Sequence, residues 1–171
     1  MRVAKVICLI GIILTAFSCS VKLEKDIETI WPDGSSHKVV YYEMKKGKKS
    51  KVREERFYES GDKEMIGEFN GIKKEGDWMY WYVDGKKWSQ ASYSNDLKEG
   101  KAIVWRENGN KNYEGEYLTG KPHGLWIFYD IDGSRLKEVL FEYGQKVNEK
   151  SFKEGVPFNL PAGDSIIVNI E

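Results

Sequence analysis

The stretch YEGEYLTGKPHGLWIFYDIDG, which runs from Tyr113 to Gly133, contains five aromatic residues, four glycines and one histidine. Rings and glycines at this density are typical of a ligand site or of a repeating structural unit, and the rest of the chain distinguishes the two. Two sets of glycines recur at a spacing of 24 residues: Gly76, Gly100 and Gly124, and Gly85, Gly109 and Gly133. The stretch is therefore interpreted as one unit of a repeat.

Aromatic residues, with one valine among them, follow the same spacing. The columns are Phe69, Tyr93, Tyr117 and Phe141; Trp81, Trp105 and Tyr129; and Tyr80, Val104, Phe128 and Phe152. Residues 31–42 align with residues 58–69 at a shift of 27, so one unit contains three additional residues. Several independent columns with one period indicate a repeat array and argue against a single ligand site.

Each unit is predicted to form one β-hairpin. Asp84-Gly85 separates two aromatic runs, and Asp-Gly or Asn-Gly is preferred in two-residue hairpin turns with positive φ at both positions. Gly76, Gly100 and Gly124 precede the first strand of their units, where we expect a second turn. We therefore expect an all-β fold: about five antiparallel hairpins with a 24-residue period, in an elongated, twisted single sheet. Because a lone hairpin is marginally stable, neighbouring units should pack ring on ring.

The quoted stretch resembles a MORN repeat, whose signature is a tyrosine, Gly-Glu-aromatic, a short loop, a glycine and an Asp/Asn-Gly turn. The spacing of Gly124, Trp126 and Tyr129 is similar to the bacterial MORN variant of YwqK-like proteins. One unit departs from it, with Ala102 where tryptophan is usual and Arg106 in the column of Tyr82. The resemblance covers about residues 31–155 and is specific for the fold. For function, it implies a scaffold, a lipid- or membrane-associated module, or an extra segment attached to an enzyme. The bacterial variant is often described as an antitoxin component.

Residues 1–18 are expected to be a lipoprotein signal peptide. Arg2 and Lys5 precede an apolar run, residues 6–17, that is too short to span a bilayer but suits a secretory signal. The following Cys19 resembles the lipidated cysteine of a lipobox, although Ala16 stands where leucine is usual. An ordinary signal peptide or a short apolar helix are the alternatives. With lipidation at Cys19, we expect a cell-envelope protein anchored by lipid, in the outer membrane, on its periplasmic side or at the surface.

The other segments are assigned by composition. Residues 19–30 are highly charged and weakly periodic, so we expect a tether. The repeat array follows over residues 31–155. Residues 156–171 end in an apolar run, residues 166–170, which we interpret as a capping strand or tail that covers a sheet edge.

The sequence contains no arrangement that predicts catalysis. Lys plus Arg and Asp plus Glu number 27 each and are interspersed, so no basic face for nucleic acid is expected. His123 is interpreted as a turn residue, because no further histidine or cysteine stands at metal-ligand spacing. Acidic pairs such as Glu54–Glu55 are interpreted as solvated. We predict no catalytic residue, no metal and no cofactor, which makes an enzyme, such as a glycan hydrolase, the least favoured class.

Two functional hypotheses remain. The first is a non-enzymatic envelope lipoprotein that binds or scaffolds an envelope protein or glycan through a repeated sheet surface. Both faces of the first strands carry apolar residues, so one face is either a partner surface or covered by curling or by the tail. Trp81, Trp105 and Tyr129 are the candidate partner-binding residues, expected as a ladder with rungs about 10 Å apart. The second hypothesis, an antitoxin or immunity-type protein that masks a toxin, is implied by the resemblance alone.

Overall fold

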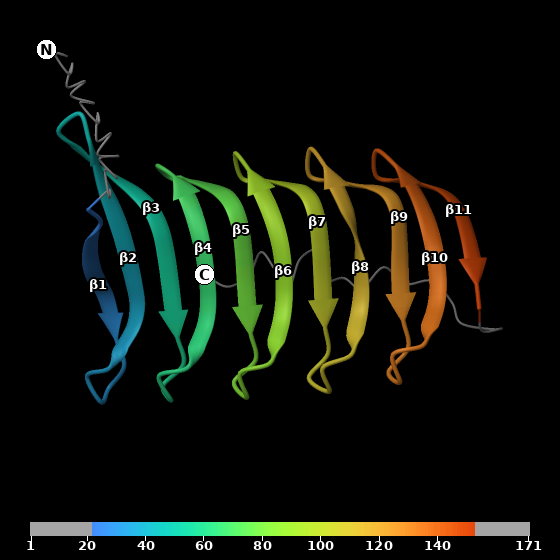
Figure 1. Cartoon of the computed structure of the whole chain (residues 1–171), viewed down its shortest axis with the longest axis horizontal. Helices are drawn as coiled ribbons and strands as arrows, with labels where there is room; N and C mark the ends of the chain where they lie inside the picture. The colour runs from blue at the N-terminus through green and yellow to red at the C-terminus, as the bar shows by residue number, and fades with distance from the viewer. Residues whose placement is uncertain (1–21, 153–171) are drawn as a thin grey trace, which may run out of the picture.

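The computed structural model describes residues 22–152, which form one antiparallel sheet (Figure 1). Each strand pairs with its neighbours in the chain, and β1 and β11 form the two open edges. The described part of the chain contains no helix, so none there is long and apolar enough to cross a membrane. The predicted all-β antiparallel fold is confirmed. The strands are β1 (Glu24–Ile30), β2 (Ser36–Lys45), β3 (Lys48–Phe57), β4 (Lys63–Asn70), β5 (Lys73–Trp81), β6 (Lys87–Ser94), β7 (Leu97–Trp105), β8 (Lys111–Leu118), β9 (Lys121–Tyr129), β10 (Arg135–Glu142) and β11 (Gln145–Ser151).

The first strand lies in the segment that we expected to be a tether. β1 pairs with β2 through Asp26 opposite Val40 and Ile27 opposite Val39. The sequence did not predict it because an edge strand buries little, and Ile27 is 54% exposed. Its charged residues protect the open edge from pairing with other chains. The signal peptide with Cys19, and the apolar run at residues 166–170, lie outside the described residues.

The connections that contain Asp-Gly or Asn-Gly are not two-residue turns. In the β5–β6 connection the amide of Gly85 donates to the carbonyl of Tyr82 (2.9 Å), and the amide of Tyr82 donates to the carbonyl of Lys86 (2.8 Å). Gly85 has φ 80°, whereas Asp84 does not have positive φ. This is a three-residue loop that ends in a left-handed glycine. The carboxylate of Asp84 accepts from the amide of Lys86 (3.0 Å), which is why aspartate suits this position.

Two-residue turns do occur, but at the other end of the sheet. Both residues of each have positive φ at Lys46-Gly47, Asn95-Asp96, Thr119-Gly120 and Tyr143-Gly144. The type of these turns was not predicted from the sequence, because none of the four contains the Asn-Gly or Asp-Gly pair that identifies it.

Gly76, Gly100 and Gly124 lie inside β5, β7 and β9 and not in turns ahead of them, which corrects our expectation. Their φ angles are 65°, 80° and 71°, and the strand register shifts next to each of them. They are therefore β-bulges, which bend a strand and increase its twist. Glycine is required because other residues rarely adopt this backbone conformation.

Two clusters of buried side chains form the main core on one face of this single sheet. They consist of Met65, Trp78, Tyr80, Tyr93, Ala102, Tyr113, Tyr117, Trp126, Phe128, Val139 and Phe141. Val39 and Val40 on β2 are buried as well, at consecutive positions that face opposite sides of the sheet. Tryptophan rings lie over glycines: a Cβ atom added at Gly67 would overlap the ring of Trp78, and one added at Gly115 would overlap that of Trp126. Each ring thus fills the space that the glycine leaves open.

Residue sizes in this core compensate one another. Ala102 stands 24 residues from both Trp78 and Trp126 in the sequence, and its partner on β6 is Ala91 and not glycine. Trp126 makes edge contacts with the rings of Tyr117 and Phe141, at centroid distances of 5.0 and 6.0 Å. Such pairs contribute about 0.5–1.5 kcal/mol each beyond burial.

A hydrogen bond joins each hairpin to the next at the end with the longer loops. The hydroxyl of Tyr58 donates to the carbonyl of Trp81 (2.6 Å), and that of Tyr82 donates to the carbonyl of Trp105 (2.8 Å). Arg106 takes this place in the β7–β8 connection and donates to the carbonyl of Tyr129 (2.8 Å). The arginine that departs from the sequence pattern therefore retains the same contact.

Arg106→Met is expected to lower the free energy of unfolding by about 2 kcal/mol, because hydrogen bonds from a charged group are lost. The guanidinium of Arg106 also donates to the carbonyls of Lys111 (2.8 Å) and Asp130 (3.3 Å), which would lose a partner. Urea unfolding measures the change. Arg106→Tyr, which supplies the hydroxyl found at Tyr58 and Tyr82, should lose less; equal losses in both variants would contradict this role.

Candidate binding surface

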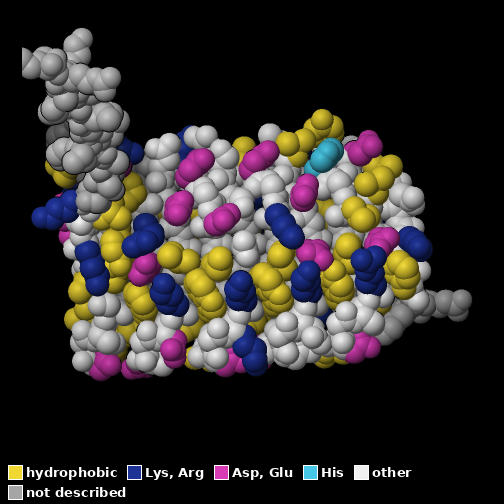
Figure 2. All heavy atoms as spheres, in the orientation of Figure 1, with side chains coloured by type: hydrophobic (Ala, Val, Ile, Leu, Met, Phe, Trp, Pro, Cys, Tyr) yellow, Lys and Arg dark blue, Asp and Glu magenta, His cyan; other side chains and the backbone are white. Residues whose placement is uncertain are grey.

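The candidate residues Trp81, Trp105 and Tyr129 lie half-buried on the face opposite the core, at the ends of β5, β7 and β9. Each is paired across strands with a basic residue, and Phe57 on β3 is paired in the same way. We call this set the ring–cation row: Phe57, Lys63, Trp81, Lys87, Trp105, Lys111, Tyr129 and Arg135. Figure 2 shows hydrophobic and basic side chains alternating along this face.

Basic side chains occupy the spaces between the rings. The Lys87 Nζ atom lies 5.7 Å from the ring centroid of Trp105, and the Lys111 Nζ atom lies 5.8 Å from that of Tyr129. Cation–π contacts at exposed sites contribute about 0.5–1 kcal/mol. The rings belong to neither core cluster. The row is therefore neither an open ladder of bare rings nor a packed core.

Carboxylates neutralise one half of the row. Glu114 accepts hydrogen bonds from Lys111 Nζ (2.8 Å) and from the hydroxyl of Tyr129. Burial raises the pKa of Glu114, but these hydrogen bonds outweigh it and lower the pKa overall. Burial, followed by the hydrogen bond to Glu114, raises the pKa of Tyr129 to about 12. Arg135 similarly donates to Glu138 (2.7 Å).

The other half of the row keeps its positive charge. Lys63 and Lys87 are exposed and, within residues 22–152, form no ion pair. Three residues after them the chain has Ile66 and Gln90, so the carboxylates found at the corresponding positions of the neutralised half are missing. The surface around Trp81 is thus aromatic and cationic.

Glu54 and Glu55 are buried, at 3% and 8% exposure, and are not solvated as expected. Basic side chains permit this: Glu54 accepts from Lys51 Nζ (2.6 Å) and Arg56 Nε (2.9 Å), and Glu55 lies 3.4 Å from Arg53 Nε. Burial raises the pKa of Glu54, but the hydrogen bonds from Lys51 and Arg56 lower it overall. Adjacent strand residues face opposite sides of a sheet, so the two carboxylates do not form an acid–base pair.

His123 lies in β9 and not in a turn, which corrects our expectation. Its side chain supports the β10–β11 turn, since the Nδ1 atom accepts from the amide of Tyr143 (3.5 Å). The carboxylates of Glu75 and Glu99 accept from the turn amides of Asn95 and Thr119 in the same way. Among the residues described, no group of three or more His, Cys, Asp or Glu side chains is placed to hold a metal ion.

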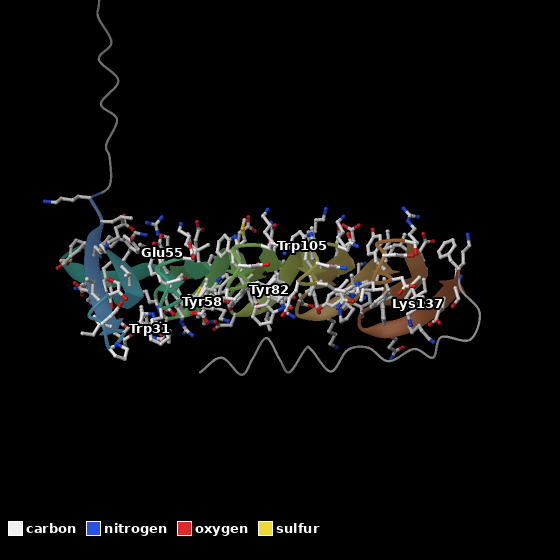
Figure 3. The ribbon with its side chains drawn as sticks, turned by 90° about the horizontal axis from the view of Figure 1, so that it is seen from below. Trp31, Glu55, Tyr58, Tyr82, Trp105 and Lys137 are labelled. Carbon is white, nitrogen blue, oxygen red and sulfur yellow. The ribbon has the colours of Figure 1, made fainter. Side chains whose placement is uncertain are left out.

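Sequence reasoning found the rings Trp81, Trp105 and Tyr129 of the row but missed its cations. It also missed a buried lysine, Lys137, on the other face of the sheet. The cations recur with the same 24-residue spacing as the rings, so that spacing would have revealed them. Lys137 is buried beside Phe128, with Nζ 5.3 Å from the ring centroid, and burial lowers its pKa. Figure 3 shows Lys137 on one side of the sheet and Trp105 and Glu55 on the other.

No family model and no curated protein matches the sequence. Among solved structures, one match is a protein of unknown function from Bacteroides fragilis, which is 10% identical. The match covers 77% of this chain and 93% of that chain, with a TM-score of 0.24, which is too low to support an inference about this protein.

Proposed function

We propose that this protein is a non-enzymatic binding or scaffolding lipoprotein of the cell envelope. The observation that carries the proposal is the ring–cation row. Its rings are half-exposed, recur on every second strand and lie on the face that the core does not use. Aromatic side chains beside cations on a sheet face are the kind of residue that carries binding energy at interfaces.

The proposal includes a repeat array of about five MORN-type hairpins with a 24-residue period. The recurrent hydrogen bonds support it, since Tyr58 to Trp81 and Tyr82 to Trp105 are equivalent contacts 24 residues apart. The sequence around Cys19 supports a lipid anchor in the outer membrane, on its periplasmic side or at the surface. The partner would then be an envelope protein or glycan.

Trp105→Ser tests the proposal. We expect capture of the tagged protein by its own envelope fraction to fall at least about tenfold, as for an interface anchor. The free energy of unfolding should fall by only about 1 kcal/mol, because the ring makes cross-strand contacts outside the core. Val83→Ser, at an exposed apolar loop residue outside the row, is the control and should leave capture unchanged. Unchanged capture by Trp105→Ser would refute a binding role for the row.

A further inference from the structure

The unneutralised half of the ring–cation row is suited to an anion. Lys63 and Lys87 flank Trp81 on the neighbouring strands β4 and β6. Within the described residues, neither lysine would have to break an ion pair to bind an anion, whereas Lys111 and Arg135 are held by carboxylates at 2.8 and 2.7 Å. The described contact of Lys87 is with the ring of Trp105. The charge at this half therefore favours an acidic ligand.

The spacing of the row favours a ligand that repeats. Rings stand on β3, β5 and β7 and cations on β4 and β6, so like groups recur every two strands, or about 10 Å. A linear polysaccharide with alternating acidic and neutral sugars repeats every disaccharide, a length close to this spacing. Alternate side chains of an extended peptide recur at only about 6.6 Å, which does not match.

The side chains also suit sugars. The C–H faces of a sugar ring pack on an aromatic face, and Trp81 and Trp105 present half-exposed rings for such contacts. Sugar hydroxyls need polar partners, and the side-chain amide of Gln90, three residues after Lys87 on β6, forms no hydrogen bond within the described chain. An amide supplies both donors and an acceptor for hydroxyl groups.

We propose that the half of the row from Phe57 to Trp105 binds a linear acidic polysaccharide. Trp81 and Trp105 pack on its sugar rings, and Lys63 and Lys87 pair with its carboxylates. The inference rests on the proposed binding function and specifies the chemistry of the partner.

Titration of tryptophan fluorescence with a hyaluronan oligosaccharide, on the detergent-solubilised full chain, tests this inference. The double variant Lys63→Gln/Lys87→Gln should bind at least about tenfold more weakly, because two charge-assisted contacts are lost. The control, Lys73→Gln/Lys121→Gln, removes the same charge from exposed lysines at the first positions of β5 and β9, outside the row. It should change the affinity less than about twofold, since exposed charges that lie away from a ligand are largely screened.

A neutral cello-oligosaccharide and polyglutamate should both bind at least about tenfold more weakly than the acidic oligosaccharide, since each lacks one of the two features the row recognises. Equal losses in the two double variants, or equally tight binding of polyglutamate, would overturn the inference. Absence of hyaluronan binding by the wild type would do so as well. If Trp105→Ser still reduces envelope capture in that case, the general binding function stands and only the polysaccharide is wrong.

Discussion

Replacing Trp126 by alanine is expected to lower the free energy of unfolding by about 4 kcal/mol, as large-to-small changes do in well-packed cores. The side chain is 2% exposed, lies over Gly115 and contacts the rings of Tyr117 and Phe141. Its Nε1 atom donates to the carbonyl of Glu116 (3.1 Å), so the variant also loses a hydrogen bond. Chemical denaturation followed by circular dichroism measures the change.

The control for this prediction is Trp105→Ala, the same substitution on the opposite face. Trp105 is half-buried and outside the core clusters, so its loss should cost about 1 kcal/mol. Equal losses of stability at Trp126 and Trp105 would contradict the prediction, because they would mean that both faces of the sheet are packed equally.

The sheet could be predicted because its signals are local. Aromatic runs around Asp84-Gly85 and Asn108-Gly109 indicate strands joined by short connections, and alternation along a strand assigns Trp78 and Trp81 to opposite faces. The edge strand β1 could not be predicted, since a strand with one neighbour shows little apolar alternation.

Turn and bulge geometry could not be predicted in the same way. A glycine in the sequence indicates a special backbone conformation but not which one, so Gly76 in a bulge and Gly85 in a loop look alike. The 24-residue spacing indicates the cations of the row, but their position opposite the rings depends on strand register, which the sequence does not give. Lys87 lies opposite Trp81 only because the β5–β6 register shifts beside the loop.

Gly115→Ala is expected to lower the free energy of unfolding by about 3 kcal/mol, at the upper end of the range for overpacking. The backbone of Gly115 does not require glycine, because its φ is not positive, but the new methyl group would overlap the ring of Trp126. The pair Ala91–Ala102 shows the alternative, since alanine stands at the glycine position where the tryptophan is missing. Urea unfolding of the single variant measures the loss.

The double variant Gly115→Ala/Trp126→Ala separates this clash from any general intolerance of alanine at Gly115. Without the ring, the methyl group has free space and recreates the pairing of Ala91 with Ala102. Adding Gly115→Ala to Trp126→Ala should then cost nothing or stabilise the protein slightly. The new methyl group fills part of the cavity and removes the backbone freedom of glycine in the unfolded chain. A coupling free energy of about 3 kcal/mol between the two sites is the expected result. Additive losses would show that Gly115 is needed for its backbone, and that the tryptophan–glycine pair is not what sets the size pattern of this core.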